Sequence, residues 1–191
     1  TDMQRSRATW EGNWRVNTAW ADDVKAVLSY QDAQSREYIT EDRNTAADRV
    51  RDVTYDERTL QANLQGSKLI RMGSGADAWA QKLTYGLDYT RAQVENLQRG
   101  VTPPAGETSP LKRFPDTTES RAALFVQDEF IRGPWSITPG VRFDSFRIKA
   151  DQAGFAANAV SLSGHATSPK LGVLYRANGA WSVCGNYAAG F

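Results

Sequence analysis

The single histidine of the chain, His165, carries the side chain best suited to bind a metal directly. It lies between Ser161 and Ser168, in a segment rich in glycine, serine and alanine that is predicted to be an exposed loop. A neutral imidazole is a good axial ligand for the iron of a porphyrin, so His165 is a candidate haem ligand. A solvated loop histidine without a ligand is the simpler interpretation, and we favour it.

Ser163, His165 and Asp151 have the side-chain types of a hydrolytic triad. A nucleophile and its base must lie in contact, and closeness in sequence within a loop does not supply that geometry. The hydrolase hypothesis is therefore the weaker one, and no enzymatic activity is predicted.

Two further clusters have simple structural interpretations. The segment from Gly73 to Gly75 lacks the Lys-Ser/Thr pair that follows in a phosphate-binding loop, so it is predicted to be a hairpin turn. The acidic residues Glu41, Asp42, Asp48 and Asp52 lack the spacing and the central glycine of a calcium loop. They are predicted to lie in a solvated loop.

The elements that must position these side chains are predicted to be β-strands. Between Trp135 and Asp144, bulky apolar residues alternate strictly with polar or small ones. A period of two residues gives a strand one apolar and one polar face. The predicted strands lie within residues 10–16, 24–31, 59–65, 79–89, 123–130, 135–144, 168–176 and 181–187.

Short and long connections alternate between these strands. Three of the connections are long, namely Ile39 to Arg49, Glu95 to Glu119 and Lys149 to Thr167. The intervening connections, such as Thr18 to Asp23, Gly66 to Asp77 and residues 177–180, are shorter. Long extracellular loops opposite short periplasmic turns are typical of an outer-membrane β-barrel, whereas compact soluble domains rarely repeat such long loops.

Strand length and aromatic placement also favour a membrane barrel. A tilted strand crosses the bilayer in roughly 9–11 residues, and the excess, such as Thr54 to Arg58, is predicted to stand above the membrane. Tryptophans fall near predicted strand ends, where an interfacial girdle belongs. These residues are Trp10, Trp20, Trp79, Trp135 and Trp181. No apolar run approaches the ~18 residues of a membrane helix.

The charge of the chain excludes some functions. Lys and Arg number 23 against 22 Asp and Glu, which gives a net charge of +1 and argues against a nucleic-acid or anionic-lipid footprint carried by bulk charge. A single cysteine, Cys184, excludes an internal disulfide and a cysteine metal cluster. No signal peptide precedes Thr1, which indicates a mature, trimmed or partial chain.

Charged residues recur on the predicted polar faces of the strands. They could line a path for a solute, but cross-strand ion pairs within a barrel interior are the favoured interpretation. The residues concerned are Lys82, Asp88, Glu129, Arg142, Asp144, Lys170 and Arg176.

The segments AALFVQDEF, WSITPGVRFDSF, SPKLGVLYR and WSVCGNYAAGF resemble consecutive barrel strands of TonB-dependent outer-membrane receptors, most closely the haem and haemoglobin receptors. The resemblance is firm over Arg121 to Phe191 and looser upstream, in YQDAQSREYITEDRN and YDERTLQANLQG. In this family a Phe-Arg-Ala-Pro motif follows the Tyr-Ala-x-Gly segment; here residues 187–190 are followed by Phe191. The chain departs from the family at Cys184, where an aromatic residue is common.

The resemblance implies an all-β, antiparallel transmembrane β-barrel, with about eight of its ~22 strands in residues 1–191 and no plug domain in this chain. It implies a bacterial outer-membrane location and uptake of haem, haem from a haem protein, or a ferric siderophore as transported ligand. The expected partners are membrane lipid and, through the plug, the TonB system. No intrinsic cofactor, catalytic residue or metal site is expected, and His165 is the one candidate cofactor-binding residue.

Three alternatives stay open. The first is a complete eight-stranded barrel with a structural or adhesin role, which Phe191 favours because such barrels tend to end on an aromatic residue. The second is a barrel enzyme built on His165, and the third is a soluble lipocalin-like barrel with its apolar face inside.

Overall fold

The computed structural model describes residues 1–75 and 78–190, and all of its strands belong to one eight-stranded sheet. The strands are β1 (Asp2–Arg15), β2 (Asp23–Glu41), β3 (Arg49–Met72), β4 (Trp79–Val101), β5 (Thr117–Arg132), β6 (Trp135–Ala150), β7 (Leu162–Arg176) and β8 (Ser182–Ala188). In the described ranges, no helix has the length and apolar character needed to cross a membrane.

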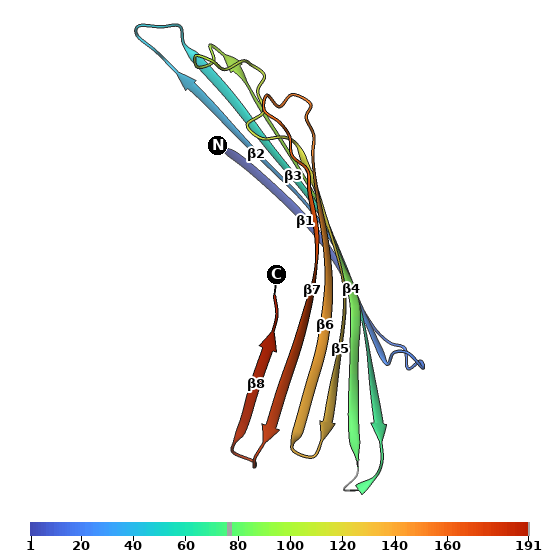
Figure 1. Ribbon diagram of the computed structural model, residues 1–191. Helices are drawn as coiled ribbons and strands as arrows, with labels where there is room; N and C mark the ends of the chain where they lie inside the picture. Colours follow the sequence, from blue (N-terminus) through green and yellow to red (C-terminus); the bar gives the residue numbers. More distant parts are fainter. Residues whose placement is uncertain (76–77, 191) are drawn as a thin grey trace.

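Strands that are consecutive in sequence are neighbours in the sheet, and every pair is antiparallel. Figure 1 shows one curved sheet, with the three longer loops at one end and the β3–β4, β5–β6 and β7–β8 turns at the other. Strands β1 and β8 form its two edges and do not pair with each other in the described residues. The predicted all-β antiparallel architecture is confirmed, but the sheet is open and is not a closed eight-stranded barrel.

The register gives the sheet an apolar face and a polar face. Leu64 lies opposite Leu87, Leu87 opposite Leu124, and Leu124 opposite Phe143, so one apolar row crosses four strands. Because successive side chains of a strand point to opposite faces, the adjacent positions form a polar row. That row contains Asn63, Asp88, Ala123 and Asp144.

The sheet has almost no buried apolar core of its own. Within the described ranges, the buried hydrophobic residues are Ala21 and Ala123, whereas Leu124 and Phe143 are 61% and 52% exposed. A continuous exposed apolar surface of this kind requires a partner or a lipid environment to cover it.

Aromatic rings cover glycines on neighbouring strands. A Cβ atom on Gly66 would lie 2.9 Å from the ring of Tyr85, and one on Gly86 would lie 2.7 Å from the ring of Phe125. Each ring lies directly across the register from its glycine, on the apolar face for Tyr85 and on the polar face for Phe125. These glycines leave space for cross-strand aromatic packing.

Several predicted loops are shorter than expected. The predicted loop Ile39 to Arg49 reduces to residues 42–48, because β2 continues to Glu41 and β3 begins at Arg49. Likewise β4 continues to Val101 and β7 begins at Leu162. Of the predicted connection Gly66 to Asp77, residues 66–72 belong to β3, and residues 76 and 77 lie outside the described residues.

Cross-strand ion pairs explain why the polar extension of β2 and β3 stays in the sheet. Arg36 Nε lies 2.7 Å from Asp52 Oδ1, and Glu41 lies 3.3 Å from Arg49 and 3.6 Å from Arg51. The hydrogen bond from Arg36 lowers the pKa of Asp52. Since both faces are polar here, the extension carries no apolar alternation that a sequence pattern could detect.

Candidate functional site

An arginine bridges two carboxylates on the polar face. Arg142 Nη1 on β6 lies 2.6 Å from Asp88 Oδ2 on β4, and Arg142 Nε lies 2.9 Å from Asp144 Oδ1. Strand β5 runs between them and contributes Ala123, whose small buried side chain lets Arg142 cross to Asp88. Asn63 on β3 also donates a hydrogen bond to Asp88. The predicted ion pairs are confirmed at these residues.

Other predicted charges on this face are held by neutral partners. Glu129 accepts a hydrogen bond from the Ser136 hydroxyl at 2.7 Å, and Lys170 donates to Gln127. At β1 and β2, Lys25 pairs with Glu11 at 2.7 Å. A polar, hydrogen-bonded face of this kind can contact water, as the inner wall of a water-filled barrel does.

Two more of the charged residues predicted for the polar face, Lys82 and Arg176, take no part in these contacts. Lys82 lies directly opposite Glu129 in the register, and Arg176 is exposed at the end of β7. Neither makes an ion pair with a described residue.

The loop of residues 102–116 folds back over the end of β4. The backbones of Gln98 and Leu111 exchange hydrogen bonds of 2.8 and 2.9 Å. Asn96 donates to the Phe114 carbonyl at 2.6 Å and accepts from the backbone N–H of Arg113 at 2.8 Å. Asn96 and Gln98 are only 7% exposed as a result. The sequence predicted this segment only as a loop, since its fold depends on contacts with β4.

Arg113 fastens this loop to the polar face. Its guanidinium group donates to both carboxylate oxygens of Glu107, at 2.9 and 3.1 Å, and to Gln98 Oε1 at 3.1 Å. A bidentate guanidinium–carboxylate pair fixes geometry as well as charge. The ring of Phe114 lies edge-on to Tyr55 on β3, with centroids 6.1 Å apart. Burial raises the pKa of the Tyr55 hydroxyl, and the nearby Glu57 carboxylate adds to the rise.

Hydrogen bonds join the second of the longer loops to the third loop and to the start of β3. The Thr102 carbonyl accepts a hydrogen bond from Arg49 Nε at 3.1 Å, next to the loop of residues 42–48. The backbone N–H of Asp151 donates to the Asp116 carbonyl at 2.8 Å, which joins the third loop to the second. We name residues 42–48, 102–116 and 151–161 the loop rim. The loop rim lies at one end of the sheet, opposite the β5–β6 and β7–β8 turns (Figure 1).

His165 is not in a loop, so its predicted placement is wrong. It lies in β7 opposite Ser145, on the same face as Tyr89 and therefore on the apolar face. The segment is a strand because Leu162 to His165 pair with Ser145 to Ile148 of β6. Its role as a haem ligand stays a prediction.

The other candidate clusters do not form a site. No hydrogen bond joins Ser163 to His165 among the described residues, and Asp151 lies in the loop rim. No group of three or more His, Cys, Asp or Glu residues able to hold a metal ion occurs in the described ranges. Gly73 and Gly75 have positive φ values of 74° and 61°, as a tight turn requires.

Comparison with known proteins places the fold. Residues 1–191 match the family model described as TonB dependent receptor-like, beta-barrel. No curated protein matches the sequence.

Solved receptor structures share the arrangement at low identity. The ferric citrate transporter FecA in its unliganded form is similar with a TM-score of 0.71 and 17% identity, over 96% of this chain and 27% of that one. A double mutant of the Serratia marcescens haemophore receptor HasR, in complex with its haemophore HasA and haem, gives 0.70 and 16%, over 98% and 30%. BauA, the ferric preacinetobactin receptor from Acinetobacter baumannii, gives 0.57 and 14%, over 96% and 30%.

These structures are all much longer than this chain, which spans between 27% and 30% of their length. At this identity they show the fold alone, while the family model matches the whole sequence. The chain therefore belongs to the TonB dependent receptor-like β-barrel family.

Proposed function

We propose that the chain forms part of the barrel wall of a bacterial outer-membrane receptor that takes up an iron source, with haem or haem from haemoglobin as the first candidate. The observation that carries this proposal is the match of the whole sequence, residues 1–191, to the receptor barrel family. In this proposal residues 1–191 belong to the barrel domain, and the plug lies outside them.

The two faces of the sheet support the placement in a membrane. The apolar row would contact lipid, where the exposure of apolar side chains carries no free-energy penalty. Its residues are Leu64, Leu87, Leu124 and Phe143. The network of Asp88, Arg142 and Asp144 would face the interior, where water and a plug can satisfy the remaining polar groups.

The loop rim supplies the proposed first contacts with the ligand. Its second loop is hydrogen-bonded to β4, to Arg49 at the start of β3 and to the third loop, so this part of the rim is held in place before a ligand arrives. A preorganised surface loses less entropy on binding than a mobile one. Import would then need energy from the TonB system, delivered through the plug.

The choice between haem and a siderophore rests on the strand resemblance, which favours the haem receptors. His165 as a haem ligand is a further prediction, but its side chain lies on the apolar face, opposite from the Asp88–Arg142 pair. We therefore propose that the loop rim, rather than His165, makes the contacts with the ligand that begin uptake. A siderophore receptor of the same fold is the alternative.

Growth on defined iron sources tests this function. A strain without the full-length receptor should lose growth on haem or haemoglobin as sole iron source and keep growth on ferric citrate. Deletion of tonB should give the same loss, and plasmid-borne receptor should restore growth. Loss on a siderophore instead would favour the alternative, and unchanged growth on all sources would favour a structural or adhesin role.

A further inference from the structure

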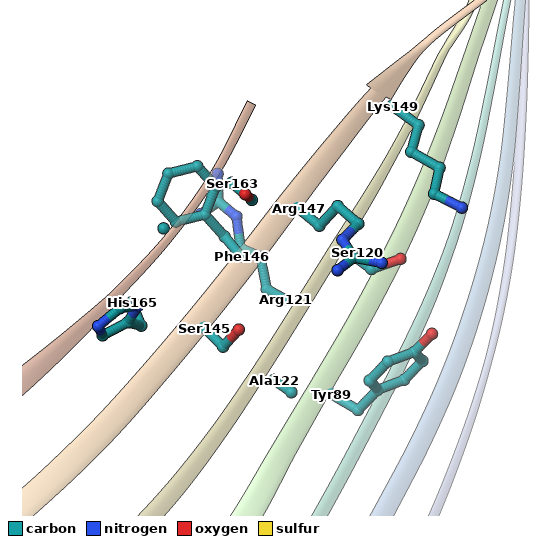
Figure 2. Close-up of a pocket in the computed structure, with 11 residues that line it drawn as sticks. Tyr89, Ser120, Arg121, Ala122, Ser145, Phe146, Arg147, Lys149, Ser163 and His165 are labelled. Atoms are coloured by element: carbon teal, nitrogen blue, oxygen red, sulfur yellow. The ribbon is translucent and has the colours of Figure 1, made fainter. Parts of the chain in front are cut away.

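A groove with cationic and hydroxyl side chains borders the apolar face on the side of the loop rim (Figure 2). Its volume is about 800 Å³. Among the residues that line it, those on the apolar face are Tyr89, Ser120, Ala122, Ser145, Arg147, Lys149, Ser163 and His165. Arg91 lies directly opposite Ser120 and next to this groove. We name Arg91, Arg147 and Lys149 the groove cations.

The groove lies where the composition of the apolar face changes. Along β6, the positions on this face are Val141 and Phe143, and then Ser145, Arg147 and Lys149. Along β4 the corresponding change is from Leu87 and Tyr89 to Arg91. In Figure 2, Arg147 and Lys149 extend from β6 on the side of Tyr89, whereas Phe146 and Arg121 point the other way. The groove therefore borders the apolar surface at the level where hydrocarbon would give way to headgroups.

The groove cations lack anionic partners in the protein. None of the three makes an ion pair or a side-chain hydrogen bond with another described residue, and all three are exposed. Other cations on the same face are neutralised: Arg58 lies 3.5 Å from Asp32, and Lys68 lies 2.6 Å from Asp22. Among the described residues, the groove therefore brings together three exposed cations that have no anionic partner in the protein.

We propose that the groove binds the phosphate of an anionic lipid headgroup in the outer leaflet. Arginine offers a planar fork that matches two phosphate oxygens, and lysine adds a point charge. The hydroxyls of Ser120, Ser145 and Ser163 line the same groove and can donate further hydrogen bonds. The acyl chains would continue onto the apolar face beside Tyr89 and Phe143. This continuity favours a lipid over free phosphate.

The proposal rests on the proposed place of the apolar face in the membrane, but not on the identity of the transported ligand. Full-length receptor would be purified in a neutral detergent and titrated with lipid A, with phosphatidylcholine and with inorganic phosphate. The groove variant carries Arg91→Gln, Arg147→Gln and Lys149→Gln together. The matched control removes three exposed cations from the polar face, Arg5→Gln, Arg15→Gln and Arg176→Gln.

Each cation near an anionic lipid surface contributes about a factor of five to binding. The groove variant should therefore bind lipid A about 100-fold more weakly at low ionic strength, while the control binds within about threefold of the wild type. Phosphatidylcholine and inorganic phosphate should bind weakly to all three proteins. Heat-modifiable gel migration of each variant verifies folding. If the groove variant does not fold, the single variants Arg91→Gln, Arg147→Gln and Lys149→Gln replace it, and each should bind lipid A about fivefold more weakly.

Equal losses in the groove and control variants, or no loss in the groove variant, would overturn the proposal. Inorganic phosphate binding as tightly as lipid A would overturn the lipid as the source of the anion. Iron uptake by the same strains is measured separately. Wild-type uptake without lipid A binding would overturn only this inference, and lipid A binding without uptake would overturn only the proposed function.

Discussion

An arginine substituted at one of two neighbouring positions in β3 tests which face of the sheet contacts lipid and which contacts water. Leu64 and Gln65 are consecutive, so their side chains point to opposite faces of the sheet. Leu64 lies between Ala26 and Leu87 on the apolar face, and Gln65 lies between Lys25 and Gly86 on the polar face. Leu64→Arg and Gln65→Arg therefore introduce the same side chain at the same depth in different surroundings.

The expected cost follows from the environment of each position. An arginine on the lipid face near the bilayer midplane costs about 2–4 kcal/mol, which corresponds to a roughly 30- to 1,000-fold shift in the folding equilibrium. Arginine at Gln65 should cost under about 1 kcal/mol, mostly from repulsion by Lys25, whose charge is already paired with Glu11.

Urea titration of the full-length receptor, folded into phosphatidylcholine vesicles and followed by tryptophan fluorescence, measures both free energies. Gln65→Arg is the internal control for insertion of a bulky charge into β3. Similar losses for the two variants would refute the assignment of the faces. A larger loss for Gln65→Arg would reverse it and favour a soluble barrel with its apolar face inside.

Four other outcomes are expected. Arg142→Met should destabilise the receptor by about 1 kcal/mol, because the pair is partly exposed, and Asp88→Asn should recover part of the loss in a double-mutant cycle. The pKa of Asp22 is lowered chiefly by Lys68, so its contribution to stability is present above the ordinary carboxyl pKa and is lost as the pH falls through the lowered value; in acid titrations Asp22→Asn should flatten this loss. His165→Ala in the full-length receptor should leave haem affinity and the Soret spectrum nearly unchanged, and a large loss would establish it as a ligand. Residues 1–191 expressed alone should aggregate in detergent, because β1 and β8 are unpaired edges, and a monodisperse, heat-modifiable monomer would contradict this.

The faces of the sheet could be predicted because the two surroundings of a barrel wall leave a strong pattern in the sequence. The alternation from Trp135 to Asp144 assigned each of these ten residues of β6 to the face on which the structure places it. Lipid on one side and water on the other impose a contrast at every second residue. The antiparallel arrangement followed from the alternation of short turns and long loops, which is typical of an outer-membrane barrel.

The extensions of β2 to β4 could not be predicted for the converse reason. Near Arg36 and Asp52 both faces are polar, and the strands are held by backbone pairing and cross-strand ion pairs. The error at His165 has the same origin, because small and polar residues on both faces of β7 resemble a loop. The burial of Asn96 and Gln98 depends on the fold of a loop whose own sequence shows no regular pattern.

The difference between the two surfaces also decides where ligand specificity should be sought. The strands are constrained by lipid on one face and by their neighbours in the sheet, so most of their alternation reflects the barrel wall. Arg113, Glu107 and Phe114 are held instead by contacts that the loop rim makes with β4 and Tyr55. These side chains can change without disturbing the sheet, because β4 pairs with β5 only as far as Val94. Exchange of residues 102–116 between related receptors should therefore alter ligand preference while the barrel still folds.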